Sequence, residues 1–183
     1  MKGTETKLKD CWILEPDVYE DERGFFYEGF NSEKFKKIVG VDFVPKQLNQ
    51  SRSVRGVLRG LHFQLNPKAQ AKLVSCTEGE LIDVAVDLRA NSPTFKEHVV
   101  LRLSDENKKQ LFVPKGFAHG FMVLSEYARI TYQVDEIYSP DHDTGIIYSD
   151  PEINVSWILP ESDIILSIKD QSLKKLAETA INF

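Results

Sequence analysis

Long apolar runs are missing from this 183-residue sequence, and cysteines are few. No stretch approaches the roughly 18 consecutive apolar residues that a membrane-spanning helix needs, so no association with a membrane is expected. The N-terminal segment has no apolar core of the signal-peptide type. The two cysteines, Cys11 and Cys76, form neither a CxxC pair nor a disulfide framework, and reduced thiols are expected. Together these absences predict a cytoplasmic protein.

Positive charge is in deficit, with 23 lysines and arginines against 28 aspartates and glutamates and a net charge of −5. Phosphate backbones favour a basic protein face, so this balance argues against nucleic acid as a partner. Against that background the cluster Arg52, Arg55 and Arg59 stands out. It is either a solvated strand face or part of a site for an anionic ligand.

Short strand-like segments separated by turn residues dominate what is present. Residues 81–88, LIDVAVDL, alternate strictly and put four aliphatic side chains on one face and Asp83, Ala85 and Asp87 on the other. Gly79, in the preceding TEGE stretch, predicts a hairpin turn. Further β-branched and aromatic runs follow at 98–104, 110–114, 119–125 and 128–138.

Helices are few and short. Ser32 is suited to cap a helix over 33–39, and Gly40 stands where that helix would end. Residues 172–179, SLKKLAET, form a second short amphipathic candidate. Many closely spaced strands with two peripheral helices favour a β-sandwich or barrel. We therefore expect one mainly-β domain over residues 1–183, in which polar residues on the inward face are candidate functional groups.

Two isolated histidines lie in stretches that resemble the two motifs of the cupin family, whose fold is a double-stranded β-helix. In the first stretch, GVLRGLHFQ, Gly56 precedes His62 by the cupin interval. In the second, VPKGFAHGF, the residues Pro114, Gly116 and His119 match the cupin pattern. The resemblance implies a cupin-like jelly-roll barrel with a few short peripheral helices.

The metal ligands of the cupin motifs are largely absent. Gln64 stands where the second histidine belongs, and the stretch that follows has no glutamate but carries Lys68 and Lys72. Two histidines are too few for zinc or ferrous iron, which want three or more N, O or S ligands, and an ammonium group would repel a cation. We therefore expect a barrel without a metal. A packed core residue stays the alternative account of each histidine.

Without a metal, histidine, lysine and arginine together suit the removal of a proton beside a carbonyl group. A neutral histidine accepts a proton near pH 7, and a lysine ammonium stabilises the enolate oxygen that forms. Arg59 suits a phosphate group, and Asp170 is a candidate partner to orient the base. Tyr132 and Tyr138 are candidate proton donors, because a phenol is protonated at pH 7. Barrel core explains Tyr132 equally well.

Beyond the cupin motifs, the chain resembles one family in particular, the dTDP-4-dehydrorhamnose 3,5-epimerases of the nucleotide-sugar pathway to dTDP-L-rhamnose. The matching stretches span most of the chain in family order. They are DERGFFYEGF (21–30), QLNQSRS (47–53), GVLRGLHFQ (56–64), QAKLV (70–74), DVAVDLR (83–89), SPTF (92–95), VPKGFAHGF (113–121), YSPDHDTGI (138–146), DP (150–151) and LSIKD (166–170).

The resemblance implies a catalytic role for four residues. His62 resembles the base that removes the protons at C3 and C5, with Asp170 as its hydrogen-bonded partner. Lys72 resembles the group that faces the C4 oxygen, and Tyr132 resembles the acid that reprotonates from the other face.

The resemblance also implies a set of substrate contacts. Arg23 and Arg59 resemble the arginines that hold the diphosphate, and Tyr138 resembles the aromatic residue that stacks on thymine. The sequence departs from the family at Asp143, where Glu is common, and at Tyr148, where Trp is common. The remaining substrate-contact positions are Phe26, Glu28, Gln47, Leu48, Asn49, His119, Asp143 and Lys169.

The family resemblance implies a homodimer with exchanged N-terminal segments, a dTDP-sugar substrate, and neither a metal nor an organic cofactor. Two other functions stay open. One is a sister enzyme, a single-site 3-epimerase or a 3,4-ketoisomerase on a related dTDP-keto-sugar. The other is a non-catalytic sugar-binding cupin, which predicts loss of the base, the lysine or the acid.

Overall fold

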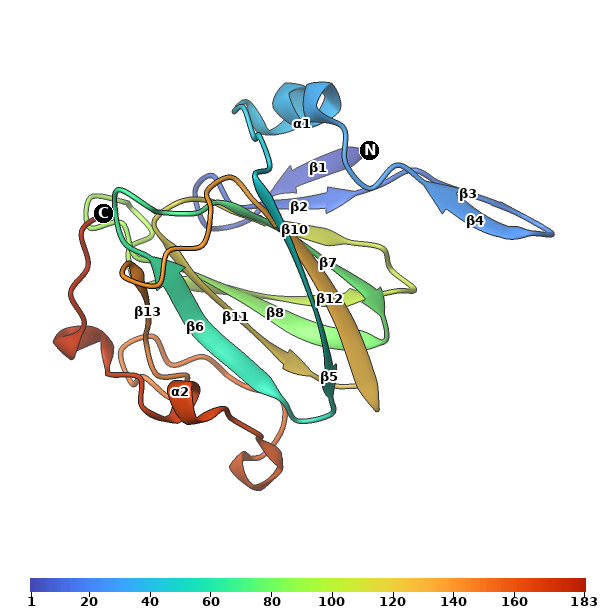
Figure 1. The fold of residues 1–183 in the computed structure, drawn as a ribbon. Helices are drawn as coiled ribbons and strands as arrows, with labels where there is room; N and C mark the ends of the chain where they lie inside the picture. Colours follow the sequence, from blue (N-terminus) through green and yellow to red (C-terminus); the bar gives the residue numbers. More distant parts are fainter.

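Two antiparallel sheets face each other in the computed structural model, which describes residues 1–183 (Figure 1). The six-stranded sheet runs in the order β1 (Lys2–Glu5), β2 (Trp12–Glu15), β10 (Gln110–Val113), β7 (Lys72–Glu78), β12 (Tyr127–Val134), β5 (Gln47–Val54). The five-stranded sheet runs in the order β13 (Asp143–Gly145), β6 (Leu58–Gln64), β11 (Phe117–Val123), β8 (Glu80–Asp87), β9 (His98–Ser104). The predicted cupin-like jelly roll is confirmed.

The main core fills the space between the two sheets, and the alternation in β8 is confirmed with both of its faces buried. Leu81 and Ala85 point into the barrel with Asp83 between them, whereas Val84 and Val86 belong to a second apolar cluster. That second cluster includes Ile153, Val155 and Leu176 from the C-terminal part of the chain. Because this segment covers the outer face of the five-stranded sheet, the aliphatic face of β8 packs outward and its acidic face points inward.

The hairpin predicted at Gly79 is wrong. Gly79 has φ +74°, but β7 and β8, which it joins, belong to different sheets. The glycine forms a corner at which the chain crosses the core. A Cβ there would lie 2.1 Å from the carbonyl oxygen of Tyr127, so the close approach of β12 excludes a larger residue.

A ribbon of two strands, β3 (Val18–Asp21) and β4 (Gly24–Tyr27), projects from the body of the molecule (Figure 1). We call residues 18–27 the arm. Its strands pair only with each other. The turn at its outer end stands apart from the body in the view of Figure 1, while the Lys108 ammonium group lies over the ring of Phe25 on β4.

The first helix, α1 (Ser32–Val39), packs Phe35 against the outer face of the six-stranded sheet. Its N-cap is Asn31 and not Ser32, because the Asn31 side chain accepts hydrogen bonds from the amides of Glu33 and Lys34. The predicted end at Gly40 is confirmed, with φ +84° and an amide that donates to the Lys36 carbonyl.

The helix predicted over 172–179 is wrong. Only the short 3-10 turn η2 (Leu176–Glu178) forms there, because the Lys174 carbonyl accepts from the amide of Ile147 and keeps the backbone extended. A four-residue helix, α2 (Ile168–Gln171), lies just before it, and η1 (Glu161–Asp163) is a further 3-10 turn. No helix in the structure has the length and apolar character needed to span a membrane.

Candidate active site

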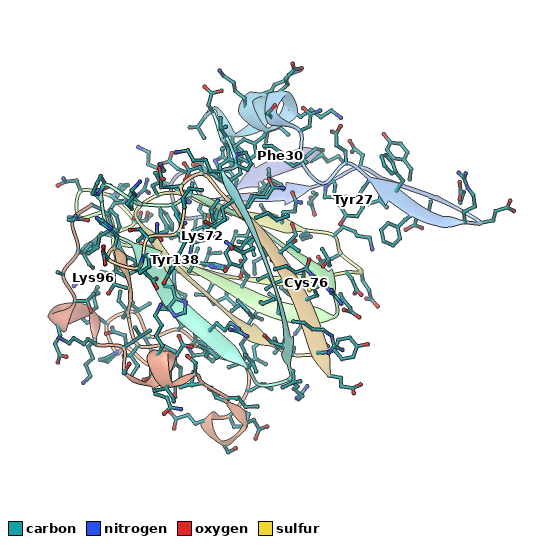
Figure 2. The ribbon with its side chains drawn as sticks, in the orientation of Figure 1. Tyr27, Phe30, Lys72, Cys76, Lys96 and Tyr138 are labelled. Carbon is teal, nitrogen blue, oxygen red and sulfur yellow. The ribbon has the colours of Figure 1, made fainter.

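A cavity of about 350 Å³ opens between the sheets at one end of the barrel. It brings together eight residues predicted from the sequence, although they come from β5, β6, β7, β12, β13, α2 and the loop after β12. Figure 2 shows two of them, Lys72 and Tyr138, close together at this end. The lining residues are Gln47, Asn49, His62, Phe63, Gln64, Gln70, Lys72, Tyr132, Tyr138, Asp143 and Lys169.

His62 and Asp170 form a hydrogen-bonded pair at the cavity wall. Strand β6 carries His62, and α2 carries the buried Asp170, whose Oδ1 lies 2.6 Å from His62 Nε2. Ser167 caps α2 and donates from its hydroxyl to Asp170 Oδ2 at 2.6 Å. Burial raises the pKa of Asp170, but the hydrogen bonds from His62 and Ser167 outweigh burial and lower the pKa overall. The carboxylate therefore holds the proton on Nε2 and leaves His62 Nδ1 as an acceptor.

Two glycines let β6 and β11 approach closely beside this pair. A Cβ on Gly60 would lie 2.5 Å from the Cα of Gly120, and a Cβ on Gly120 would lie 2.7 Å from the Arg59 carbonyl oxygen. The close approach allows His62 and His119 to face each other in register on the same side of the sheet.

His119 makes a second histidine–carboxylate pair, entirely inside the barrel. Its Nε2 lies 2.7 Å from Oδ1 of Asp83 on β8, and both side chains are buried. The second oxygen of Asp83 is buried and has no hydrogen-bond partner. The imidazole of His119 lies 6.5 Å, centroid to centroid, from the ring of Tyr132.

Lys72 is a buried cation on the opposite sheet. Strand β7 carries it, and its Nζ donates to the His62 carbonyl oxygen at 3.4 Å. Burial lowers the pKa of Lys72 to about 8, while the negative charges of Asp143 and Asp83 partly oppose that shift. Below pH 8 the side chain is an ammonium group that can stabilise an oxyanion.

Tyr132 lies on β12, next to β7 in the six-stranded sheet. Burial raises its pKa, and the positive charge of Arg59 acts in the opposite direction. Its hydroxyl therefore stays protonated at neutral pH and can donate a proton. His62 and Tyr132 approach the cavity from different sheets, so an acceptor and a donor face it from opposite walls.

Hydrogen bonds organise the mouth of the cavity around Asp143. Its carboxylate accepts from the Tyr138 hydroxyl at 3.0 Å and pairs with the Lys169 ammonium group. The hydrogen bond with Asp143 raises the pKa of Tyr138. The amide of Tyr138 donates to Gln47 Oε1 at 2.9 Å, and the Gln47 side chain donates to Asn49 Oδ1 at 2.7 Å.

Sequence reasoning missed that the side chains of Gln64 and Gln70 hold the loop after β12 in place through its backbone groups. Gln64 is buried, donates to the carbonyls of Lys68 and Ile137, and accepts from the amide of Ser139 at 2.7 Å. Gln70 donates to the Glu136 carbonyl oxygen. The only available signal was Gln64 at the position of a cupin metal ligand. No three His, Cys, Asp or Glu side chains gather anywhere in the chain in a way that could hold a metal ion.

Six predicted substrate contacts lie outside the cavity lining, and one of them is the buried His119 described above. Arg59 is exposed, and its guanidinium group donates to the Ser53 hydroxyl. Glu28 pairs with a lysine of α1, and Leu48 is 66% exposed beside lining residues, because alternate side chains of β5 point outward. The other two, Arg23 and Phe26, lie on the arm.

Comparison with known proteins first places the chain among proteins with the cupin-like fold, since its structural relatives share this two-sheet barrel. It belongs to the dTDP-4-dehydrorhamnose 3,5-epimerase family, whose model matches residues 5–178. The chain is similar to the dTDP-4-dehydrorhamnose 3,5-epimerase of Shigella flexneri, with 49% identity over 97% of each chain.

Solved structures agree with the family assignment. The epimerase of Elizabethkingia anophelis has 50% identity, a TM-score of 0.93 and 97% coverage of each chain. An epimerase of Legionella pneumophila, solved in complex with dTDP-4-keto-L-rhamnose, has 45% identity and a TM-score of 0.94 over 98% of this chain and 94% of its own. A 3′-monoepimerase of Streptomyces bikiniensis, in complex with dTDP-quinovose, has 31% identity and a TM-score of 0.87 over 94% of this chain and 86% of its own.

Proposed function

We propose that this chain is an isomerase that epimerises dTDP-4-dehydro-6-deoxy-D-glucose at C3 and C5 to give dTDP-4-dehydro-L-rhamnose, in the biosynthesis of dTDP-L-rhamnose. Membership of the family over residues 5–178 supports the reaction. So does the likeness to the Legionella enzyme, whose ligand is dTDP-4-keto-L-rhamnose.

The observation that carries this proposal is the division of the cavity into two walls. The acceptor His62 belongs to the five-stranded sheet, and Lys72 and Tyr132 belong to the six-stranded sheet. Epimerisation requires a proton to leave one face of a carbon and another proton to arrive on the opposite face. A base and an acid on opposite walls meet that requirement.

In the proposed reaction, His62 Nδ1 removes the proton from C3 or C5. The C–H electron pair forms a carbon–carbon double bond to C4, and the carbonyl electrons move to the C4 oxygen, where the Lys72 ammonium stabilises the enolate. Tyr132 then protonates the carbon from the other wall. The cycle leaves an imidazolium and a phenolate, and proton exchange with solvent restores both. Asp170 stabilises the imidazolium form of His62.

We assign the nucleotide to the mouth of the cavity. The ring of Tyr138 is half exposed there and is available to stack on thymine. Lys169 and Arg59 supply positive charge for the diphosphate, and Arg23 is a third candidate. The proposed substrate contacts from the cavity and its surroundings are Phe26, Glu28, Gln47, Leu48, Asn49, His119 and Asp143.

We infer a homodimer in which the arm of one subunit serves the site of the other. Within one chain, Arg23 bonds only to Asp21 of its own turn, and Phe26 is 69% exposed. The outer face of the six-stranded sheet adds exposed apolar side chains such as Leu48 and a buried amide oxygen of Gln133 that has no partner. A second copy of the chain would cover these groups.

We also infer a cytoplasmic enzyme with one domain and no metal or organic cofactor. The missing third ligand supports the absence of a metal, because His62 and His119 each already bind a carboxylate through Nε2. The match of one family model to residues 5–178 supports a single domain.

The test is incubation of the protein with dTDP-4-keto-6-deoxyglucose in deuterated water. Incorporation of deuterium with inversion at both C3 and C5 is the expected result. Exchange at C3 alone would identify a 3′-monoepimerase, the second candidate, which the likeness to the Streptomyces bikiniensis enzyme favours. No exchange at either carbon would overturn both.

A further inference from the structure

The second histidine–carboxylate pair contains a buried carboxylate to which the proposed mechanism gives no role. Asp83 lies on β8 with no exposed surface, and its Oδ1 binds His119 Nε2 at 2.7 Å. Its Oδ2 is buried without a hydrogen-bond partner. Burying a carboxylate with one unsatisfied oxygen is costly, so its retention calls for a reason other than packing.

Asp87 provides an internal comparison. It lies four residues along the same strand, on the same face and equally buried. Its carboxylate accepts hydrogen bonds from the Arg89 guanidinium and from the hydroxyls of Ser92 and Thr94. Asp87 is therefore a satisfied structural aspartate, while Asp83 keeps one oxygen free and points into the part of the barrel next to the cavity.

We propose that Asp83 is a positioning residue for the epimerisation: its Oδ1 holds His119 in one tautomer, and its unpartnered Oδ2 provides a buried negative charge inside the barrel that favours a charged Lys72. This inference rests on the proposed function. The first part follows from hydrogen-bond chemistry. An ionised carboxylate only accepts, so the shared proton lies on His119 Nε2 and leaves Nδ1 as an acceptor beside the ring of Tyr132.

The second part follows from electrostatics. Burial disfavours the ammonium form of Lys72 and lowers its pKa to about 8, while the charges of Asp143 and Asp83 raise it and that of Lys169 lowers it. Asp143 is already engaged at the mouth by Tyr138 and Lys169. Of the two carboxylates that act on Lys72, Asp83 is the one inside the barrel. It therefore adds to Asp143 in favouring the ammonium form of Lys72.

The experiment compares Asp83→Asn with the matched variant Asp87→Asn in the full-length protein. For Asp83→Asn, we expect kcat to fall by about 10- to 100-fold, because the amide no longer dictates the His119 tautomer. We also expect the high-pH limb of the kcat/KM profile to move to lower pH by about one unit, because Lys72 loses a nearby negative charge. For Asp87→Asn, we expect a lower Tm and no shift in the high-pH limb of the kcat/KM profile.

An unchanged limb and an unchanged kcat in Asp83→Asn would overturn the proposal and leave Asp83 a structural residue. If Asp83→Asn does not fold, the wild-type protein still provides a test. The imidazole ¹⁵N shifts of His119, measured without substrate, should show the Nε2–H tautomer, and the Nδ1–H tautomer would refute the assignment. Failure of the proposed function would instead appear as a wild-type protein without epimerase activity.

Discussion

The cavity and the arm differ in how their charged groups are neutralised. In the cavity, three charged or titratable groups have internal partners: His62 has Asp170, Lys169 has Asp143, and the buried Lys72 bonds a carbonyl oxygen. On the arm, the Arg23 side chain is 85% exposed and bonds only the nearest carboxylate of its own turn. The arm contributes no residue to the cavity lining. In Figure 2, Tyr27 at the base of the arm lies well apart from Tyr138 in the lining.

This difference predicts that mutations in the cavity and mutations on the arm affect different kinetic constants. Groups fixed by internal partners are preorganised for proton transfer, and their loss should act on kcat. Exposed groups on a projecting ribbon have no fixed geometry until something binds them, and their loss should act on KM. The comparison therefore predicts large effects on turnover in the cavity and smaller effects on binding at the arm.

The largest effect is expected for His62→Ala. Because the base is lost, solvent exchange at both C3 and C5 should fall by at least about 10²- to 10⁴-fold, measured by deuterium incorporation. The control is His98→Ala, in the outermost strand of the same sheet, which should keep wild-type exchange. Asp170→Asn should reduce solvent exchange less than His62→Ala does, because it removes the group that orients the His62 base and leaves the base itself in place. Wild-type exchange in His62→Ala would assign the base to another residue.

The next effect concerns the charge on Lys72. Lys72→Met should lower kcat by about 10²- to 10³-fold, as expected for loss of an oxyanion donor, while Lys68→Met should not. Since the pKa of Lys72 is lowered to about 8, the ammonium dominates below that pH and is lost above it. The wild-type kcat/KM should therefore fall as the pH rises through about 8. A rise in KM alone in Lys72→Met would make Lys72 a binding residue.

Tyr132→Phe should separate the two proton transfers. The ring stays and only the hydroxyl is lost, so the enolate still forms and His62 can return a deuteron to the original face. We expect deuterium incorporation with little inversion, measured by NMR of the product, and the greatest loss of inversion at C5. Equal loss of exchange and inversion would mean that Tyr132 is needed to form the enolate. Unchanged inversion would assign the acid to water or to Tyr138.

The smallest effect is expected on the arm. Arg23→Ala should raise KM by about 10-fold with little change in kcat, because a charged hydrogen bond to the diphosphate is lost. If the arm serves the partner subunit, mixing Arg23→Ala and His62→Ala subunits should give about a quarter of wild-type activity at substrate well below KM, since half the dimers then have one site with both residues intact. Mixing His62→Ala with Lys72→Met should restore none. No recovery in the first mixture would contradict arm exchange.

The class of fold and the inward residues could be predicted because they depend on local patterns. The alternation around Asp83 placed a strand correctly, and the cupin spacing around His62 and His119 placed both histidines on the barrel interior. The pairing of His62 with Asp170 was expected only from the family resemblance, because 108 positions separate the two residues in the sequence.

Apart from the helix cap, which is Asn31 and not Ser32 for local reasons, the failures share one physical origin, which is tertiary contact. Gly79 has the backbone of a turn, but only the packing of β12 against it reveals a corner between sheets. The segment around Lys174 has helical periodicity, yet a backbone hydrogen bond from Ile147 holds it extended. The loop-ordering role of Gln64 depends on three backbone groups brought together from two other segments. No single-sequence pattern contains this information.

The corner at Gly79 also has a consequence for how the chain folds. Because consecutive strands such as β7 and β8 lie in different sheets, most ladders join distant segments. Strand β5 pairs only with β12, so Gln47 has no backbone partner until Val134 has been synthesised. A chain rich in such non-local ladders folds in milliseconds to seconds and not in microseconds. During synthesis at about 5–20 residues per second, β5 spends several seconds outside the ribosome with both edges unpaired. Its run of polar residues, Asn49 to Ser53, suits a strand that must stay soluble while its only neighbour is still being made.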